Sequence, residues 1–405
     1  MGLDPNTPVG ARRRTIASYL YCYARTLELA CAWTMNVPNT AFKVALGRKI
    51  GLDGLALERL GRRIAQMFST GSNGAAPTAF AQWLDAHHAE TDEGRISAVL
   101  LAVIDALSRS MTRYLANAHP GDEPTLLLLR SLQADLALGR ETLAPFATTT
   151  FEAPAPDAEG ARVDYAGTEP LLPIPSFPAR PETAVLDPNT SRPRGLSIQE
   201  AMQPENVAAQ FRRMYIEIEI SAIEVCARNV VEFRTMPNAF KVDMSQQIWD
   251  EARHAELAVA VVTGYGFELG VLHYSGLVWT RHAMGEGLAE RLAIEQCIQE
   301  GNSVDNAYSQ IQLLRRFGHT EAAEAMEWLT ADETQHAAIG NRWLLRLCGE
   351  QRDKYEAVLK TANEKIQFPL SPVNRDLREL GGYPAWYVDA LEREIEMRRK
   401  AATAS

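Results

Sequence analysis

Two short segments of the chain combine a carboxylate and an imidazole at the spacing of one helical turn. They read DEARH, from Asp250, and DETQH, from Asp332, and in each of them Glu precedes His by three residues. Side chains at this spacing project from one face of a helix and can bind a metal ion together. Both segments lie midway along apolar sequences with helical periodicity, where charged side chains are costly unless paired or metal-bound. The pattern predicts metal ligands at Glu251, His254, Glu333 and His336.

A site for two metal ions in a four-helix bundle needs one further carboxylate from each of the other two helices. Residues at equal height on antiparallel neighbours lie symmetrically about the turn that connects them. For the last two helices this turn lies near Gly318, and Glu300, 33 residues before Glu333, fits it. Glu295 would instead centre the turn at residue 314, in a segment that still reads as helix. We therefore expect Glu300 to be the third-helix ligand.

The first helix offers three glutamates, at positions 217, 219 and 224. Glu219 lies 32 residues before Glu251, within one residue of the spacing of 33 found in the other half. Glu224 lies five residues further on, about 140° around the helix, so the two cannot both face the metals squarely. We choose Glu219 as the ligand and keep Glu224 as a neighbour of the ligands or as the alternative ligand.

Asp250 and Asp332 stand directly before the two paired glutamates. They are expected to accept a hydrogen bond from the second ring nitrogen of a ligating His, including the His of the opposite motif, which would fix its tautomer. Plain solvation of these two carboxylates is the alternative interpretation.

The elements that must position these residues are predicted to be helical. Apolar residues recur every three or four positions through most of the N-terminal part and again beyond residue 204. The proline-rich, aperiodic stretch between them predicts a linker or an extended arm. The third helix of the second bundle, roughly 276–317, is expected to break or bulge around Gly301. The expected segments are a helical bundle at 1–150, the arm at 151–203, a four-helix bundle at 204–350 and a C-terminal helical extension at 351–405.

The N-terminal helices repeat part of the second bundle. PNTAFKV from Pro38 matches PNAFKV from Pro237, and sliding the two halves together pairs Glu28 with Glu224. Chance similarity between amphipathic helix pairs is the alternative. We interpret the repeat as an internal duplication whose first bundle is degenerate and metal-free, packed against the second as an intramolecular pseudo-dimer. The positions aligned with Glu219, Glu251, His254, Glu333 and His336 carry Tyr23, Asp53, Ala56, Leu136 and Gly139.

A series of motifs follows in order through residues 178–385: RPETAVLDPNTSRPRG, EISAIEV, DEARHAEL, RLAIEQCIQEGNSVD, DETQHAAIGNRWLLRLC and SPVNRDLRELGGY. This series resembles a bacterial group within the ferritin-like, non-haem di-iron carboxylate superfamily, the domain of unknown function 455 family. The resemblance implies a ferritin-like four-helix bundle in the second half of the chain, and O₂ as a cosubstrate. Together with the helical pattern and the internal repeat, it leads us to expect an all-α fold of two tandem ferritin-like four-helix bundles, the N-terminal one degenerate. Glu217 departs from it, since that family is expected to have His there. The implied ligands of two iron ions, or of a manganese–iron pair, are Glu219, Glu251, His254, Glu300, Glu333 and His336.

The composition limits the partners. A net charge of −10 argues against nucleic acid or an anionic membrane as the main partner. The five cysteines form no CxxC pair, no stretch has the length and apolarity of a membrane span, and no signal peptide is evident. We expect a cytoplasmic protein whose partners are a small-molecule substrate, an unidentified electron donor and, as one option, a second copy in a homodimer.

The expected function is that of an O₂-activating di-iron oxygenase or oxidase acting on a small molecule, by analogy an amine or an amino-acid-derived metabolite. The first alternative is a ferritin-like metal-binding or peroxide-scavenging protein without an organic substrate. The second is a helical scaffold without a metal site.

Overall fold

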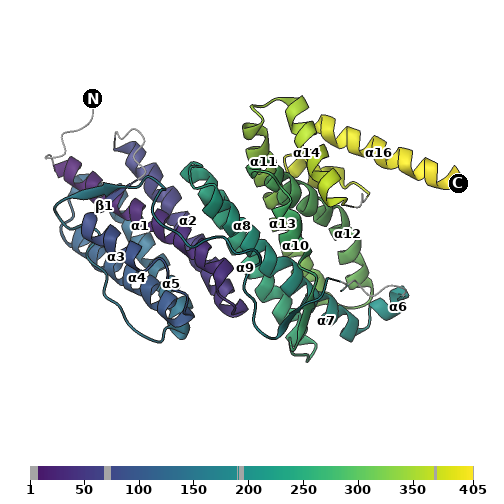
Figure 1. The fold of residues 1–405 in the computed structure, drawn as a ribbon, viewed down its shortest axis with the longest axis horizontal. Coiled ribbons are helices and arrows are strands. Elements are labelled where there is room, and N and C mark those ends of the chain that lie inside the picture. Colours follow the sequence, from purple (N-terminus) through teal and green to yellow (C-terminus); the bar gives the residue numbers. More distant parts are fainter. Residues whose placement is uncertain (1–7, 68–73, 189, 191–195, 369–371, 405) are drawn as a thin grey trace. The chain divides into compact units, whose positions relative to one another are not determined.

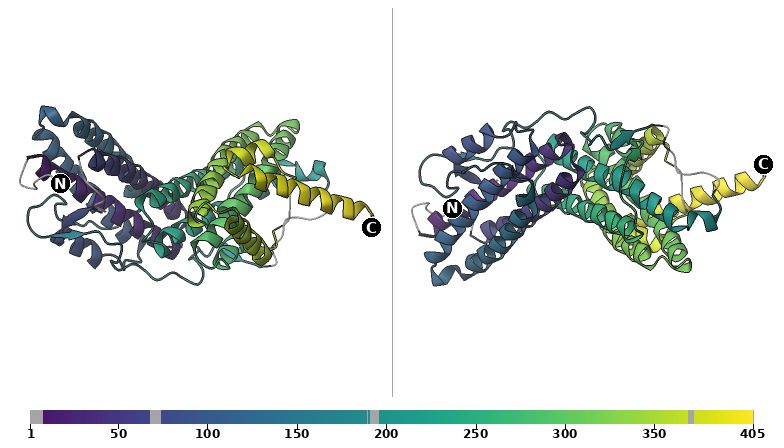
Figure 2. Two further views of the ribbon diagram at one scale, coloured as in Figure 1. Left: turned by 90° about the horizontal axis from the view of Figure 1, so that it is seen from above. Right: turned by 90° about the horizontal axis from the view of Figure 1, so that it is seen from below.

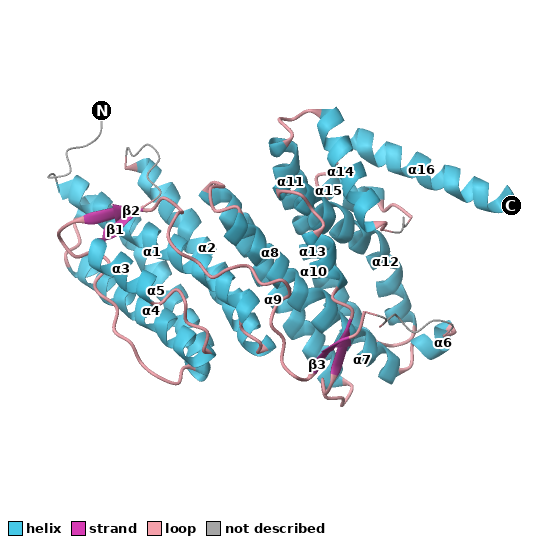
Figure 3. Ribbon diagram, in the orientation of Figure 1, coloured by secondary structure: helices cyan, strands magenta, loops and turns pink. Residues whose placement is uncertain are grey.

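The computed structural model describes residues 8–67, 74–188, 190, 196–368 and 372–404. These residues are mostly helical and form only a few three-residue strands, which confirms the all-α class (Figures 1 and 3). The chain divides into two compact units, which are described separately: unit 1 comprises 1–181 and 226–252, and unit 2 comprises 182–225 and 253–405.

Unit 1 is built from long helices joined by short turns. They are α1 (Pro8–Asn36), α2 (Thr40–Gln66), α4 (Glu93–Ala116) and α5 (Glu123–Leu143), with the shorter α3 (Thr78–Ala86) between them. α1 packs against α2, α2 against α5 and α5 against α4, and the two views of Figure 2 show these helices side by side. Asn39 starts α2 by accepting hydrogen bonds from the backbone N–H groups of Ala41 and Phe42. The Asn of the repeated PN motif is thus a helix cap in the first copy.

A row of glycines on α2 allows close packing against α9 (Asn238–Gly264), whose first half belongs to unit 1. A Cβ atom at Gly51 would lie 2.6 Å from the Trp249 side chain, and one at Gly47 would lie 2.8 Å from the Cβ of Ala252. Glycine within a helix costs about 1 kcal/mol relative to alanine. The contact with α9 accounts for glycine at these positions of the first copy.

A short 3₁₀ turn, η2 (Ala144–Phe146), follows α5, and the residues after it run as an extended arm that is helix-free in its described part up to α6 (Ile198–Ala201). Two short strand pairs hold it. Within unit 1, β1 (Ala75–Pro77) pairs antiparallel with β2 (Arg162–Asp164), and within unit 2, β3 (Ala184–Leu186) pairs parallel with β4 (Leu272–Tyr274). Residues 189 and 191–195 of the expected arm lie outside the described residues.

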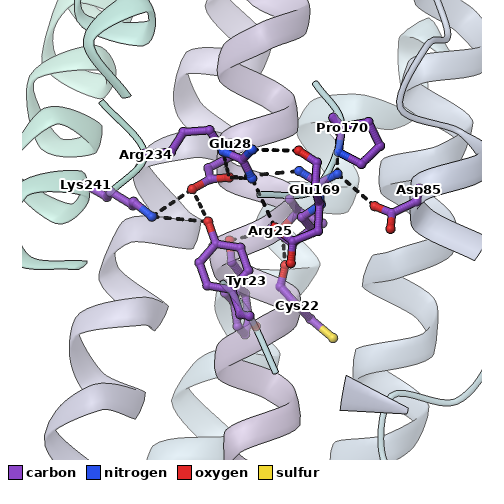
Figure 4. Close-up of polar contacts among 11 residues, drawn as sticks. Cys22, Tyr23, Arg25, Glu28, Asp85, Glu169, Pro170, Arg234 and Lys241 are labelled. Atoms are coloured by element: carbon purple, nitrogen blue, oxygen red, sulfur yellow. Dashed lines mark hydrogen bonds and ion pairs between the residues drawn. The ribbon is translucent and has the colours of Figure 1, made fainter. Parts of the chain in front are cut away.

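Glu28 is the centre of a buried polar network in unit 1 (Figure 4). Its side chain is fully buried, and its carboxylate accepts hydrogen bonds from Lys241 Nζ and Arg234 Nε, each at 2.7 Å, and from the hydroxyl of Tyr165. Arg234 also donates to the backbone carbonyl of Glu169 at 2.6 Å. The network joins α1, the arm and the start of α9. Glu28, the glutamate that aligns with Glu224, therefore has a structural role in unit 1.

Two helical segments are interrupted by π-helical turns that lie in unit 2, although residues 226–232 at the end of the first segment belong to unit 1. In the first, α7 (Pro204–Arg213) runs through the π-helical η3 (Met214–Glu219) into α8 (Ile220–Glu232). In the second, α11 (Leu288–Leu292) runs through the π-helical η4 (Ala293–Gln299) into α12 (Glu300–Arg316). α12 packs against α13 (Thr320–Leu347). The predicted third helix is thus bulged just before Gly301.

The same predicted helix is also broken near its start. α10 (Leu277–Ala283) ends before Gly285 and Gly287, and Gly287 has a φ of 82°, a conformation that favours glycine. The C-terminal extension forms α14 (Arg352–Ile366), α15 (Arg375–Leu380) and α16 (Ala385–Ala404). Among the described residues, no helix combines the length and apolarity needed to cross a membrane.

Candidate metal centre

The structure brings all six predicted ligands into one buried cluster. Glu219 is the last residue of η3, Glu300 follows η4 directly, and α13 carries both Glu333 and His336. Glu251 and His254 stand one turn apart on the continuous helix α9. None of the six is more than 7% exposed. Their candidate ligand atoms lie within 4.8 Å of one another in two groups, Glu219, Glu251, His254 and Glu333, and Glu251, Glu300 and His336.

Glu333 connects the two histidines. His254 Nδ1 lies 3.9 Å from Glu333 Oε1 and 3.4 Å from Glu219 Oε2. His336 Nδ1 lies 3.8 Å from Glu333 Oε2 and 3.7 Å from Glu300 Oε1. Donor atoms that share an ion at bond lengths of ~2.1 Å lie roughly 3 to 4 Å apart, so these separations fit a metal site. The two oxygens of Glu333 face different imidazoles, so that Glu333 would be able to hold ions at both histidines.

The charge of the cluster favours cations. Four carboxylates and two imidazoles are gathered where water has almost no access, since the two histidines are fully buried. Buried carboxylates in close proximity are costly to ionise together unless positive charge compensates them. Two divalent ions would balance four ionised carboxylates with neutral histidines. The oxygen and nitrogen donors, without thiolate, suit iron or manganese.

Two π-helical turns place the terminal carboxylates of the cluster. The backbone N–H of Ile220, directly after Glu219, donates to the carbonyl of Tyr215, and that of Glu300 donates to the carbonyl of Glu295, each five residues back. The wider turn shifts the following side chains around the helix relative to an α-helix. π-helical turns of this kind are frequent at functional sites. Sequence periodicity indicated a bulge near Gly301 but gave no signal for η3.

Asp332 orients His254 as the sequence suggested. Its Oδ2 lies 3.1 Å from His254 Nε2 and 2.9 Å from Arg253 Nη2. Burial alone would raise the pKa of Asp332, but the hydrogen bond from His254 and the charge of Arg253 together hold it below its usual value. An ionised Asp332 keeps the proton on Nε2 and leaves the lone pair of Nδ1 directed at the cluster. The sequence did not lead us to single out Arg253, although this residue lies between the α9 residues Glu251 and His254.

Other acidic residues near the cluster have different roles. Asp250 is buried and accepts a hydrogen bond from Gln246 Nε2 at 2.9 Å. Glu217, where the family resemblance led us to expect His, accepts hydrogen bonds from the backbone N–H groups of Ser275 and Leu277 at the start of α10. Glu224 is buried on α8 and belongs to neither ligand group. Of the two first-helix alternatives, the cluster contains Glu219.

The fold and the cluster define a predominantly helical protein with a buried carboxylate–histidine site suited to metal ions. The family model described as "Protein of unknown function (DUF455)" matches residues 140–389, more than half of the chain. The chain belongs to this family. The matched segment contains all six cluster residues and leaves out most of the N-terminal helices. No match is found among curated proteins or among solved structures.

Proposed function

We propose that this protein is an O₂-activating, non-haem di-iron oxygenase or oxidase of the ferritin-like type that acts on a small molecule. The observation that carries the proposal is the position of Glu333, whose two oxygens face Nδ1 of His254 and Nδ1 of His336. A carboxylate shared between two imidazoles at these distances suits two ions held close together, as in two-metal enzymes.

Each residue of the cluster has a defined part in this proposal. Glu219 and His254 would hold one ion, Glu300 and His336 the other, and Glu251 and Glu333 would serve both. Two ferrous ions, when bound, would supply electrons for the reductive activation of O₂. Asp332 holds the proton of His254 on Nε2, so that this imidazole offers Nδ1 without a competing tautomer. The burial of both histidines excludes bulk water from the reacting position.

The proposal includes a second, metal-free ferritin-like bundle in the N-terminal helices. Asp53, which aligns with Glu251, is 1% exposed and accepts hydrogen bonds from Lys49 Nζ and from Thr26 Oγ1, the latter at 3.1 Å. A Cβ atom on Gly139, which aligns with His336, would lie 3.6 Å from Lys49 Cδ. An ammonium group therefore neutralises the remaining carboxylate at the place where the other copy has metal ligands.

Metal analysis after anaerobic reconstitution with Fe²⁺ tests the proposal. We expect two iron ions per chain for the wild-type protein and fewer than one for the Glu333→Ala variant. The control is the double variant Lys49→Met/Asp53→Leu in the N-terminal helices, which leaves no unpaired buried charge and should keep the stoichiometry at two. Fewer than one ion per wild-type chain would refute the di-metal function and leave the scaffold interpretation.

The reaction with O₂ separates the proposed function from its alternative. An oxygenase or oxidase should consume O₂ slowly until an electron donor and an organic substrate, with amines tested first, are supplied. Sustained turnover of hydrogen peroxide by the iron-loaded protein without any organic cosubstrate would instead identify a peroxide-scavenging protein.

A further inference from the structure

The segment that follows α14 reaches back to the π-helical turn beside the metal centre. Arg378, on α15, is only 5% exposed and donates to the backbone carbonyl of Cys297 at 3.4 Å. The hydroxyl of Tyr383 donates to the same carbonyl at 2.5 Å. Cys297 belongs to η4 and precedes Glu300 by three residues. We call Arg378 and Tyr383 the η4 clamp.

The η4 clamp is itself held in place. Arg378 Nε and Nη2 donate to the two carboxylate oxygens of Asp305 at 3.1 and 2.7 Å, a two-point ion pair whose side chains are 6% and 1% exposed. The guanidinium carbon also lies 4.5 Å from the centre of the Tyr383 ring. A planar guanidinium paired at two points has little freedom to turn, so the group that contacts η4 is fixed.

Gly301 allows the clamp to lie directly against the backbone. A Cβ atom at this position would come within 2.2 Å of both Arg378 Nη1 and the Tyr383 hydroxyl oxygen. Any other residue would displace the clamp. Gly301 is the immediate neighbour of Glu300, so the contact is made at the backbone that carries the proposed ligand.

The same segment also contacts α13, the helix of the facing ligands. Asn341, five residues after His336, donates from Nδ2 to the carbonyl of Gly381 at 2.7 Å and accepts a hydrogen bond from the hydroxyl of Tyr355. α15 thus packs against both α12 and α13. It connects the two helices whose side chains form the Glu300–His336 pair.

We propose that Arg378 and Tyr383 are positioning residues for Glu300, an inference that rests on the proposed di-metal function. By binding the Cys297 carbonyl, the clamp keeps η4 in its π-helical register, in which the N–H of Glu300 bonds to the carbonyl of Glu295. If the turn relaxed toward an α-helix, the Glu300 side chain would rotate around the helix and away from His336. The clamp acts on one metal position through the backbone carbonyl of Cys297.

The variant that tests this role is Tyr383→Phe, which removes one hydroxyl and keeps the ring. The matched control is Tyr387→Phe, because Tyr387 stacks on Tyr383 at 6.1 Å between ring centroids and is a tyrosine of the same segment. Stepwise binding of Mn²⁺ is measured by calorimetry and by electron paramagnetic resonance, and the iron-loaded proteins are compared by Mössbauer spectroscopy.

We expect Tyr383→Phe to weaken one of the two metal-binding steps roughly tenfold, the usual effect of losing support around a metal ligand. The Mössbauer signal of one iron should change while that of the other is retained, and Tyr387→Phe should match the wild type. Unchanged affinities and spectra in Tyr383→Phe, or equal weakening of both steps, would overturn the positioning role. Wild-type protein that binds fewer than one ion would remove the proposed function as well, so the two failures are distinguishable.

A second variant tests the same role even if proteins with a single substitution at Arg378 do not fold. Arg378→Met with Asp305→Asn removes both members of the buried ion pair and leaves no unpaired charge. We expect the same selective weakening of one metal-binding step. Wild-type affinity for both ions in this folded double variant would also contradict the inference.

Discussion

Lys49 is expected to hold the N-terminal helices together by neutralising the buried carboxylate of Asp53. Its ammonium and the carboxylate of Asp53 are 2.5 Å apart, and the two side chains are 3% and 1% exposed. Lys49→Met keeps a side chain of similar length and leaves Asp53 buried without its cation. Removing one partner of a buried ion pair costs about 3–5 kcal/mol of unfolding free energy. That is a large part of the total of roughly 5–15 kcal/mol found for most proteins.

The loss should depend on pH in a defined direction. Burial is the largest influence on Asp53 and raises its pKa above the usual value, although Lys49 and Thr26 act in the opposite direction. A carboxylate whose pKa is higher in the folded than in the unfolded state binds its proton more tightly in the folded state. It therefore raises the unfolding free energy as the pH falls from above the folded-state pKa to the unfolded-state pKa. Without Lys49 the folded pKa rises further. The defect of Lys49→Met should therefore be largest at neutral and alkaline pH and shrink as the pH approaches about 4.

Urea denaturation followed by circular dichroism at pH 8 and at pH 5 measures both effects. The control is the double variant Lys49→Met/Asp53→Leu, in which no buried charge remains, and it should recover most of the lost stability. A loss below about 1 kcal/mol at pH 8 would contradict the assignment of this pair as a buried, dry ion pair. So would a double variant that is as unstable as the single one, or a defect that does not change with pH.

Further outcomes follow from the metal centre and from the helix contacts. Asp332→Asn should weaken metal binding 10- to 100-fold, because His254 loses the carboxylate that fixes its Nε2–H, and calorimetric titration with Mn²⁺ measures it. Glu219→Gln should lower the iron content per chain while Glu224→Gln leaves it at two, which elemental analysis distinguishes. Gly51→Ala should lower the unfolding free energy by about 1–3 kcal/mol, measured in urea, since the new methyl group meets Trp249. Gln247→Lys should reduce metal binding by placing an ammonium group one turn before Glu251, again read out as iron per chain.

The sequence predicted the cluster well because its signals are local. Two Glu–His pairs at helical spacing, and the distances along two hairpins, were sufficient to select Glu300 and to prefer Glu219 to Glu224. The π-helical turn η3 could not be predicted, because it depends on contacts made far along the chain, such as that of Glu217 with the backbone at Ser275. The η4 clamp was missed for the same reason. Arg378 lies beyond the last ligand in sequence, and only the fold brings it to Cys297.

The two PN-AFKV segments carry different residues one helical turn before the aligned carboxylates Glu251 and Asp53. In the second copy Gln247 donates from Nε2 to Glu251 at 3.2 Å, and in the first copy Lys49 makes the corresponding contact with Asp53. The two donors stand at the same position of the repeat. A neutral amide can support a ligand and leave its negative charge available to a metal ion, whereas an ammonium group neutralises that charge itself. A single exchange of Gln and Lys thus distinguishes Glu251, the carboxylate proposed to bind metal, from Asp53, whose charge an ammonium group neutralises. Gln247→Lys should therefore bring Glu251 closer to the state of Asp53.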